Sequence, residues 1–552
     1  MSSFRLKAEL QTMPVANALV LYIPESNRFY SPNRDRTMIP ILMLALSLGA
    51  DPLEADVILQ GGTVFDGSGQ PGMVADVAIK GERIVATGKF TAAGKPKVID
   101  CTGLYIAPGF IDLHTHSDDP LTQPGTRYNR NYQQQGVTLV ITGNCGAGPV
   151  DAAGYFAKME KGGIGTNVIH QVPHNNLRAQ VMGNVNRAPT ANELAAMEKL
   201  VDKAMSDGCF GLSTGLIYNP GIYSKTEEII ALAKVAAKHG GHYASHIRGE
   251  GADVLASIEE ALRIGKEAGL PVHISHLKAS GRPNWGKSAD IVALIEKARK
   301  AGQVVTADQY PYVASSTSLR ATLIPARYRE GSQEDFLRRL NDREQLQKLS
   351  EAIEAELKHM REGADLRIAR YTKKPQWQGK DLVTIANMEG KTPLDIALEI
   401  ERNGSAQIVH FSMSDEDMRF IMKQPWVATA SDGGSMIPSN TVPHPRSYGC
   451  FPRKIGRFAI GEQSLPVEQA IRSASGLPAD ILRLTDRGYL KKDYFADIVV
   501  LDPKTYRDTA TFDKPHQYAT GVKWLLVNGQ AAIANGADTN VLAGKVLRHT
   551  KK

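Results

Sequence analysis

The sequence has little of three things that would place it in a special class of protein. Only four of its 552 residues are cysteine, too few for a disulfide framework, and their number does not fix the redox compartment. The 65 lysines and arginines exceed the 58 aspartates and glutamates and give a formal net charge of +7, but they are scattered rather than gathered into a basic stripe. We therefore expect no binding to nucleic acid, which normally needs such a stripe. No apolar run is long enough to cross a bilayer, so we expect no stable membrane span.

The first 55 residues also lack the pattern of a folded domain. Residues 1–37 are polar and patternless, and residues 38–50 form an apolar run of the length of a signal-peptide core. Arg34 and Arg36 precede this run, and Met38 could be the true start of the chain. We interpret residues 1–55 as a targeting segment and expect export to the periplasm. The alternative is a short buried helix in a cytoplasmic protein.

Short β-branched runs separated by glycine-rich turns occur at both ends of the remaining chain. They cover residues 56–65, 75–79, 83–86, 496–502 and 522–529. Such runs are typical of antiparallel strands. The simplest arrangement pairs the two groups, so residues 56–106 and 485–552 are predicted to form one small β-sandwich domain.

Between these ends, strand-like and helical patterns alternate. After an opening strand that starts at Phe110, apolar strand candidates cover 138–144, 167–172, 210–217, 242–248, 271–277, 303–310 and 426–431. Helical patterns cover 191–207, 225–239, 251–269 and 287–301. Repeated βα units predict an α/β fold with a parallel sheet, and eight of them predict a TIM-like (β/α)8 barrel over residues 107–484. Residues 407–412 also have a strand pattern, which leaves nine candidates for eight places.

Residues 317–400 interrupt this alternation. Their central part, Gln333 to Glu362, is charged and helical. An insertion between two barrel strands would lie over the mouth where the βα loops converge, so we interpret it as a lid-like segment. The alternative is a solvated surface insertion without a role at the site.

Ligand-type side chains follow the predicted strands at their carboxyl ends, which a barrel gathers on one rim. They are His114, His116, Cys145, His246, His276 and Asp432. On a strand His114 and His116 would share a face, because they are two positions apart. Six such residues on one rim predict a zinc site. His242 and His273 lie inside strands, and we expect them to face helices.

Longer motifs around these residues resemble those of one enzyme family. The run Pro108-Gly-Phe-Ile-Asp-Leu-His-Thr-His116, with the later His246, His276 and Asp432, resembles the amidohydrolase superfamily. Thr-Gly-Asn-Cys145-Gly is similar to the D-aminoacylase branch, the N-acyl-D-amino-acid deacylases. So are the segments Ser-His246-Ile-Arg-Gly-Glu, Ser-His276-Leu-Lys278, Asp308-Gln-Tyr-Pro-Tyr312 and His444-Pro-Arg446-Ser-Tyr-Gly. The resemblance runs from about Asp56 to the end of the chain.

This resemblance implies a mechanism that fits metal chemistry. One zinc would be held tightly by Cys145, His246 and His276, and a weaker second position would involve His114, His116 and Asp432. A zinc ion with three protein ligands has a fourth position for water and lowers the pKa of that water. Asp432 would act as general base and acid. The implied reaction is hydrolysis of a small N-acyl-D-amino acid to a carboxylate and a D-amino acid.

Such a substrate carries a free carboxylate, which needs a fixed cation. The guanidinium of Arg446 can bind a carboxylate through two parallel hydrogen bonds. The family pattern adds Tyr218, Tyr310 and Ser316 as hydroxyl partners, and Lys278 as an electrostatic contributor. For the two tyrosines a packing role at the edge of the core is the alternative.

Two other functions remain open from the sequence. A related amidohydrolase could act on dipeptide-like or cyclic amides, although the chain offers no evident metal-bridging lysine of the kind found in hydantoin-type enzymes. A non-catalytic barrel scaffold is the other alternative, since fold alone does not establish function. It is disfavoured because all the expected ligand residues are present.

Overall fold

The computed structural model describes residues 52–550. The apolar run 38–50 lies outside the described residues, so the expectation of export stays a prediction. Within residues 52–550, no helix is both long and apolar enough to cross a membrane.

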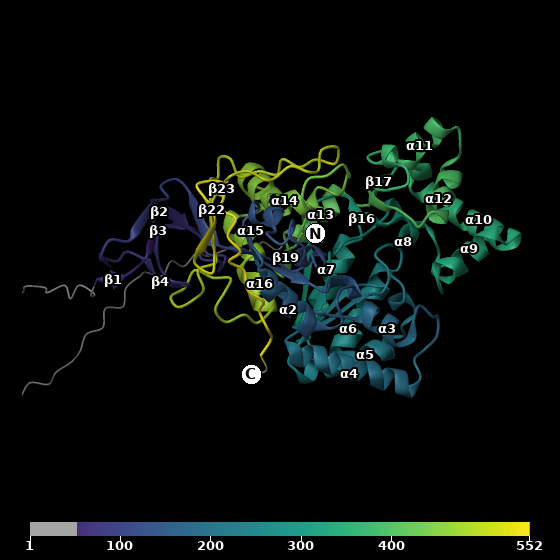
Figure 1. The fold of residues 1–552 in the computed structure, drawn as a ribbon, viewed down its shortest axis with the longest axis horizontal. Helices are drawn as coiled ribbons and strands as arrows, with labels where there is room; N and C mark the ends of the chain where they lie inside the picture. The colour runs from purple at the N-terminus through teal and green to yellow at the C-terminus, as the bar shows by residue number, and fades with distance from the viewer. Residues whose placement is uncertain (1–51, 551–552) are drawn as a thin grey trace, which may run out of the picture. The chain divides into compact units, whose positions relative to one another are not determined.

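Strands from the two ends of the chain form one nine-stranded sheet, in which purple β2–β4 and yellow β22–β23 belong to the same layer (Figure 1). Its members are β2 (Val57–Val64), β3 (Met73–Lys80), β4 (Arg83–Gly88), β6 (Lys97–Asp100), β7 (Tyr105–Pro108), β20 (Ile498–Leu501), β21 (Val522–Val527), β22 (Gln530–Ala534) and β23 (Ala537–Asp538). The junction is β7, which pairs parallel with β2 and antiparallel with β20. Alternate residues such as Val77, Ile79, Ile498 and Val500 are buried in a core of their own. The predicted small β domain from both chain ends is confirmed.

Eight parallel strands form the barrel. They are β8 (Phe110–Asp112), β9 (Val137–Thr142), β10 (Asn167–His170) continued by β11 (Val172–Pro173), β12 (Gly211–Gly215), β13 (His242–His246), β14 (Val272–Ile274), β15 (Val305–Gln309) and β19 (Val427–Thr429). The ring closes where β19 meets β8, because the Asp432 N–H donates to the His114 carbonyl oxygen at 2.8 Å and Thr115 bridges Gly433. Consecutive parallel pairing in sequence order confirms the predicted barrel.

The helices outside the barrel include α2 (Ala152–Gly162), α3 (His174–Met182), α4 (Ala191–Asp207), α5 (Thr226–Lys238), α6 (Val254–Ala268), α7 (Ser288–Lys300), α13 (Asp415–Met422), α14 (Arg446–Pro452), α15 (Val467–Ala474) and α16 (Gly476–Ile481). Four of them, α4 to α7, follow the predicted patterns closely, and the structure adds the others. Thr190 begins α4 with a complete capping box to Glu193, which satisfies otherwise unpaired N–H groups. Residues 544–546 of the C-terminal segment leave the β domain and bridge to the barrel at Ile164 and Val168.

The ninth strand candidate belongs to the insertion. Residues 407–410 form β18 (Gln407–His410), which lies between β16 (Ser315–Ser318) and β17 (Leu366–Arg370) in a separate antiparallel sheet. The insertion also contains α8 (Leu319–Leu323), α9 (Gln333–Asn341), α10 (Arg343–His359), α11 (Leu382–Glu389) and α12 (Pro393–Arg402), which form a distinct group in Figure 1. Its own hydrophobic core includes Leu366, Trp377 and Ile408. The insertion therefore runs from β16 to β18 and folds around a core of its own.

Candidate metal centre and its two cavities

The barrel rim brings together the six ligand-type residues that the sequence singled out. Their donor atoms fall into three overlapping groups, each compact enough to hold one metal ion: His114, His116 and Cys145; Cys145, His246 and His276; and His114, His276 and Asp432. All except His116 are buried. Since buried polar groups normally have partners, such a concentration of donor atoms indicates a ligand-binding function.

Three of these residues occupy backbone conformations that only local packing can hold. Cys145, His276 and Asp432 have φ values of +52°, +36° and +50°, and a left-handed conformation costs a residue other than glycine about 1–3 kcal/mol. Cys145 lies in a tight turn after β9, next to Gly143. A Cβ at Gly143 would lie only 2.2 Å from the Gln171 carbonyl oxygen, so this turn requires glycine. All three residues lie just after a barrel strand, β9, β14 or β19, at the rim.

The donor atoms of Cys145, His246 and His276 have the spacing of a metal site. Cys145 Sγ lies 3.8 Å from His246 Nδ1 and 3.8 Å from His276 Nε2. A tetrahedral zinc ion with ordinary bond lengths would hold S and N atoms about 3.5 Å apart. Burial lowers the pKa of His246, which keeps its ring neutral and able to bind a metal. These residues therefore fit a zinc ion in donor chemistry and in spacing.

Glu250, which has no role in the sequence analysis, orients His276 and lies near His246. Its Oε1 lies 2.9 Å from His276 Nδ1, and its Oε2 lies 4.0 Å from His246 Nε2. Burial would raise the pKa of Glu250, but the Lys278 ammonium and the two histidine rings hold it well below its usual range. A carboxylate behind a histidine ligand fixes the tautomer and raises the basicity of the ring. The motif that ends in Gly-Glu250 was visible in the sequence, but its function was not.

The second group is centred on Asp432. Its Oδ1 lies 3.1 Å from His116 Nε2 and 3.5 Å from His114 Nε2. Strand β8 ends at Asp112, so His114 and His116 lie just beyond the strand, and Thr115 between them forms an isolated bridge with Gly433. The reason is that the Asp112 carboxylate accepts the His114 N–H at 3.1 Å and the Ser431 N–H at 3.0 Å, which takes the backbone out of regular pairing. Both rings nevertheless reach the same carboxylate.

Asp308 is a further residue whose role sequence reasoning missed. Its Oδ2 lies 3.4 Å from His114 Nδ1 and 2.8 Å from His273 Nε2, while Oδ1 accepts the His276 N–H at 2.8 Å. Burial would raise its pKa, but the His114 and His273 rings hold it below its usual range. The expectation that His273 faces helices is wrong, because its ring supports this carboxylate. Asp308 begins the Asp-Gln-Tyr-Pro-Tyr motif, but this motif does not indicate which residues Asp308 contacts.

We expect Asp308→Asn to lower metal affinity roughly 10- to 100-fold, the range typical for loss of a carboxylate that orients a histidine ligand. The amide has one accepting oxygen, so it cannot accept from both the His276 N–H and the His273 ring, and the negative charge beside the His114 ring is lost. The measurement is a competition titration with Zn²⁺. Asp417→Asn is the control, because Asp417 is also buried but accepts the Gly286 N–H away from the centre. Equal affinities in both variants would contradict the role of Asp308.

Arg446 lies against Asp432 rather than standing free. Arg446 Nη1 is 2.7 Å from Asp432 Oδ2, Nη2 donates to the Ser316 carbonyl oxygen at 3.3 Å, and the guanidinium lies 4.7 Å from the centre of the Tyr310 ring. Burial would raise the pKa of Asp432, but Arg446 and the surrounding histidines hold it well below its usual range. Asp432 is therefore ionised at neutral pH and can accept a proton.

The remaining predicted substrate residues also lie at the centre. Tyr218 Oη hydrogen-bonds with Thr317 Oγ1 at 3.0 Å, and Ser316 Oγ donates to the Ile408 carbonyl oxygen at 2.7 Å. Lys278 pairs with Glu250 and lies 5.7 Å from the Tyr310 ring centre. The Ser316 hydroxyl already donates its hydrogen to Ile408. Unless this hydroxyl rotates, it can only accept a hydrogen bond from a ligand.

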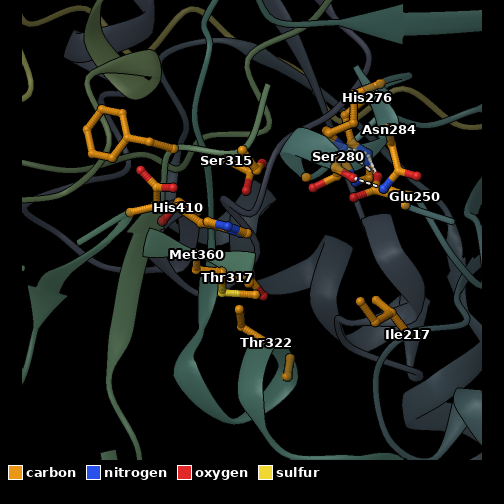
Figure 2. Close-up of a pocket in the computed structure, with 18 of the residues that line it drawn as sticks. Ile217, Glu250, His276, Ser280, Asn284, Ser315, Thr317, Thr322, Met360 and His410 are labelled. Carbon is orange, nitrogen blue, oxygen red and sulfur yellow. Dashed lines mark hydrogen bonds and ion pairs between the residues drawn. The ribbon is translucent and has the colours of Figure 1, made fainter. Parts of the chain in front are cut away.

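The metal centre opens into two cavities, each of about 550 Å³. The first, here called the lid-side cavity, lies between His246 and His276 on the barrel and Met360 and His410 on the insertion; Figure 2 shows His276 and Glu250 across from Met360 and His410. The second, the arginine-side cavity, is lined by Cys145, His116, Arg446 and Arg370 among others. Tyr218, Ser316, Thr317 and Asp432 line both cavities. The insertion therefore covers the mouth of the barrel and forms a wall of the site.

Comparisons with known proteins point in the same direction. The profile of the Amidohydrolase family matches residues 97–533. The chain is 37% identical to D-aminoacylase from Alcaligenes xylosoxydans xylosoxydans, over 91% of this chain and 99% of that protein. It is 35% identical to N-acyl-D-glutamate deacylase from the same organism, over 89% and 96%. The crystal structure of N-acyl-D-glutamate deacylase from Bordetella bronchiseptica, with zinc and a phosphonate mimic of the tetrahedral intermediate, superposes with a TM-score of 0.76 at 31% identity, covering 90% of this chain and all of that one.

Proposed function

The chain belongs to the amidohydrolase family, in its D-aminoacylase branch, and from this premise we propose that it is a zinc-dependent hydrolase of N-acyl-D-amino acids. The products are a carboxylate and a free D-amino acid. One observation carries the proposal: the Cys145, His246 and His276 donor atoms converge beside the Asp432–Arg446 pair, where two cavities meet. This arrangement combines a metal site, a proton acceptor and a carboxylate-binding cation within one site.

Cys145, His246 and His276 would hold the tightly bound zinc, and His114, His116 and Asp432 would form the weaker second position. When bound, zinc supplies a Lewis acid that lowers the pKa of a water molecule and polarises an amide carbonyl. The thiolate is a soft ligand that suits zinc, whereas the second group offers only nitrogen and oxygen donors. This difference in donors supports the proposed difference in affinity.

Asp432 is the proposed general base and acid. Its carboxylate is ionised at neutral pH and borders both cavities, so it can accept a proton from the attacking water. It then returns this proton to the nitrogen of the departing amine, which leaves as the free amino acid. Arg446 holds the Asp432 carboxylate through Oδ2, which leaves Oδ1 on the side of the histidines.

Arg446 and Tyr310 are the proposed anchors of the substrate's α-carboxylate. Both are buried; within the described part of the chain the Tyr310 hydroxyl has no hydrogen-bond partner, and Arg446 Nη1 has only its ion pair with Asp432. Unsatisfied buried donors are costly unless a ligand completes them. A carboxylate that entered beside the Tyr310 ring would accept from the Tyr310 hydroxyl and give the Arg446 guanidinium a second anionic partner. Lys278 also lies near that ring, 5.7 Å from its centre, and is paired with Glu250.

The test is a chiral substrate panel with the zinc-loaded enzyme. We expect release of free amino acid from N-acetyl-D-amino acids and no measurable turnover of their L enantiomers. The reason is that the substrate's carboxylate and its carbonyl group are each held at a fixed position, so the side chain fits on only one side of the α-carbon. Dipeptides and a hydantoin complete the panel. Preferred turnover of L-substrates, dipeptides or the hydantoin would replace the proposal. Full zinc loading without any amidase activity would favour a scaffold.

A further inference from the structure

A smaller cavity, of about 230 Å³, lies between the barrel and the insertion. Its barrel wall is formed by Asn184, which follows α3, and by Tyr218 and Asn219, which follow β12. Its insertion wall comes from the end of β16, from α8 and α9, and from the segment between these helices. A ligand in this cavity, here called the insertion-base cavity, would therefore contact both parts of the fold.

The charged residues that line the insertion-base cavity are both arginines, Arg320 and Arg329. Arg320 is neutralised, because its Nε donates to the Glu401 carboxylate at 2.6 Å. Arg329 differs, since no carboxylate in the described part of the chain lies within ion-pair distance of its guanidinium. The cavity therefore contains one positive charge that the protein does not compensate.

The guanidinium of Arg329 is only partly satisfied by the protein. Its Nη1 donates to the Ile217 carbonyl oxygen at 3.0 Å, whereas its buried Nε has no hydrogen-bond partner within residues 52–550. Burial lowers the pKa of Arg329, which means that folding removes this charge from water without supplying an anionic partner. An anion that accepts hydrogen bonds from the guanidinium would supply that partner.

Two asparagines of the barrel hold the backbone of Arg329 in place. Its carbonyl oxygen accepts from Asn184 Nδ2 at 2.9 Å and from Asn219 Nδ2 at 3.0 Å. Together with the contact to Ile217, these bonds position an arginine of the insertion from the barrel side. A charge that is fixed before a ligand arrives loses little conformational freedom when the ligand binds.

We propose that the insertion-base cavity binds a small oxyanion, an inorganic phosphate or a carboxylate, which fastens the insertion to the barrel. A cavity of this volume has room for such an ion with several water molecules, each of which occupies about 30 Å³. The site is separate from the metal centre, because no member of the three donor groups lines it. The inference therefore does not depend on the proposed reaction.

The first experiment is a calorimetric titration of the zinc-loaded wild-type enzyme with inorganic phosphate and, in a second arm, with acetate. Sodium chloride of equal ionic strength is the reference solution in both arms. We expect at least one of the two ions to bind at one equivalent, and the arm with the higher affinity identifies a tetrahedral ion or a carboxylate as the ligand. Binding of neither ion overturns the proposal.

Substitutions at Arg329 locate the bound ion. Arg329→Gln should weaken its binding roughly 10- to 100-fold, because a hydrogen-bonded charge is lost. Arg329→Lys keeps the charge without the planar fork and should have an intermediate affinity; it also keeps the test usable if Arg329→Gln does not fold. Arg327→Gln is the matched control, because Arg327 is an exposed arginine that does not line the cavity. Unchanged binding in both Arg329 variants would place the ion elsewhere, such as at the metal centre, and contradict the proposal.

Limited proteolysis tests whether the ion fastens the insertion. Chymotrypsin is suitable, because it does not cleave at the substituted arginines. The ion should slow cleavage within residues 317–400 of the wild type and of Arg327→Gln, since a ligand that bridges two parts of a fold opposes their local opening. The ion should have no such effect on Arg329→Gln. Cleavage of the wild type at the same rate with and without the bound ion would overturn the fastening role, whatever the enzyme hydrolyses.

Discussion

Asp432→Asn is expected to lower kcat/KM by roughly 10²- to 10⁴-fold, the range for loss of a positioned general base, while one equivalent of zinc stays bound. The amide has nearly the same shape as the carboxylate, and asparagine tolerates the left-handed conformation that residue 432 adopts at φ +50°. It cannot accept a proton at neutral pH. Because Cys145, His246 and His276 are unchanged, the tight metal position keeps its three donors. Steady-state kinetics and zinc analysis on the same sample measure both effects.

This substitution also leaves Arg446 without its anionic partner, so a stability control is needed. Removing one member of a buried ion pair typically costs about 3–5 kcal/mol. Asp497→Asn in the β domain is a matched control, because Asp497 is also buried and paired with an arginine, Arg487. We expect both variants to lose thermal stability and only Asp432→Asn to lose kcat. Wild-type kcat in Asp432→Asn would remove Asp432 from the mechanism.

The residues at the rim could be predicted because strand pattern and residue type agree there. His246 and His276 each end an apolar run, and in a parallel barrel all such ends meet on one rim. This rule needs no knowledge of register or of long-range contacts. The choice of Cys145, His246 and His276 as the tight set came from the resemblance, and the 3.8 Å spacings of the Cys145 sulfur from both rings are consistent with it.

The groups behind the ligands could not be predicted in the same way. Asp308 contacts His114 and His273 because β15 pairs with β14 in one particular register, and a single sequence does not reveal register between parallel strands. Glu250 follows β13 but orients a ligand from β14. The function of such a residue depends on its neighbour, so its own sequence context is uninformative.

Strand β18 illustrates a different limit. Its pattern of apolar residues suits a strand, and the structure has a strand there, but it pairs with β16 and β17 within the insertion rather than with the barrel. Local pattern determines that a segment is extended; the partner depends on which other edges are available. Because the insertion has its own core, it can provide such an edge independently of the barrel.

Cys145→Ser is expected to lower zinc affinity by more than about 100-fold, exceeding the loss usual for residues behind the ligands. Serine has nearly the same shape, so the strained turn is preserved. Its hydroxyl, however, does not ionise near neutral pH, and a neutral oxygen is a much weaker zinc ligand than a thiolate. Activity should fall with zinc occupancy and recover in part when excess zinc is added. A competition titration and the dependence of kcat/KM on free zinc measure these effects.

Cys209→Ser is the control for this variant, because Cys209 is a free, buried thiol of the hydrophobic core that belongs to none of the three donor groups. It should keep wild-type zinc affinity even if its stability falls. The comparison also distinguishes the two metal positions. If Cys145→Ser bound zinc as tightly as wild type, the firmly held ion would have to rely on His114, His116 and Asp432, and the sulfur would serve only the turn. A loss confined to Cys145→Ser would instead assign the tight position to the cysteine, with the His114–His116 pair completing the weaker one beside Asp432.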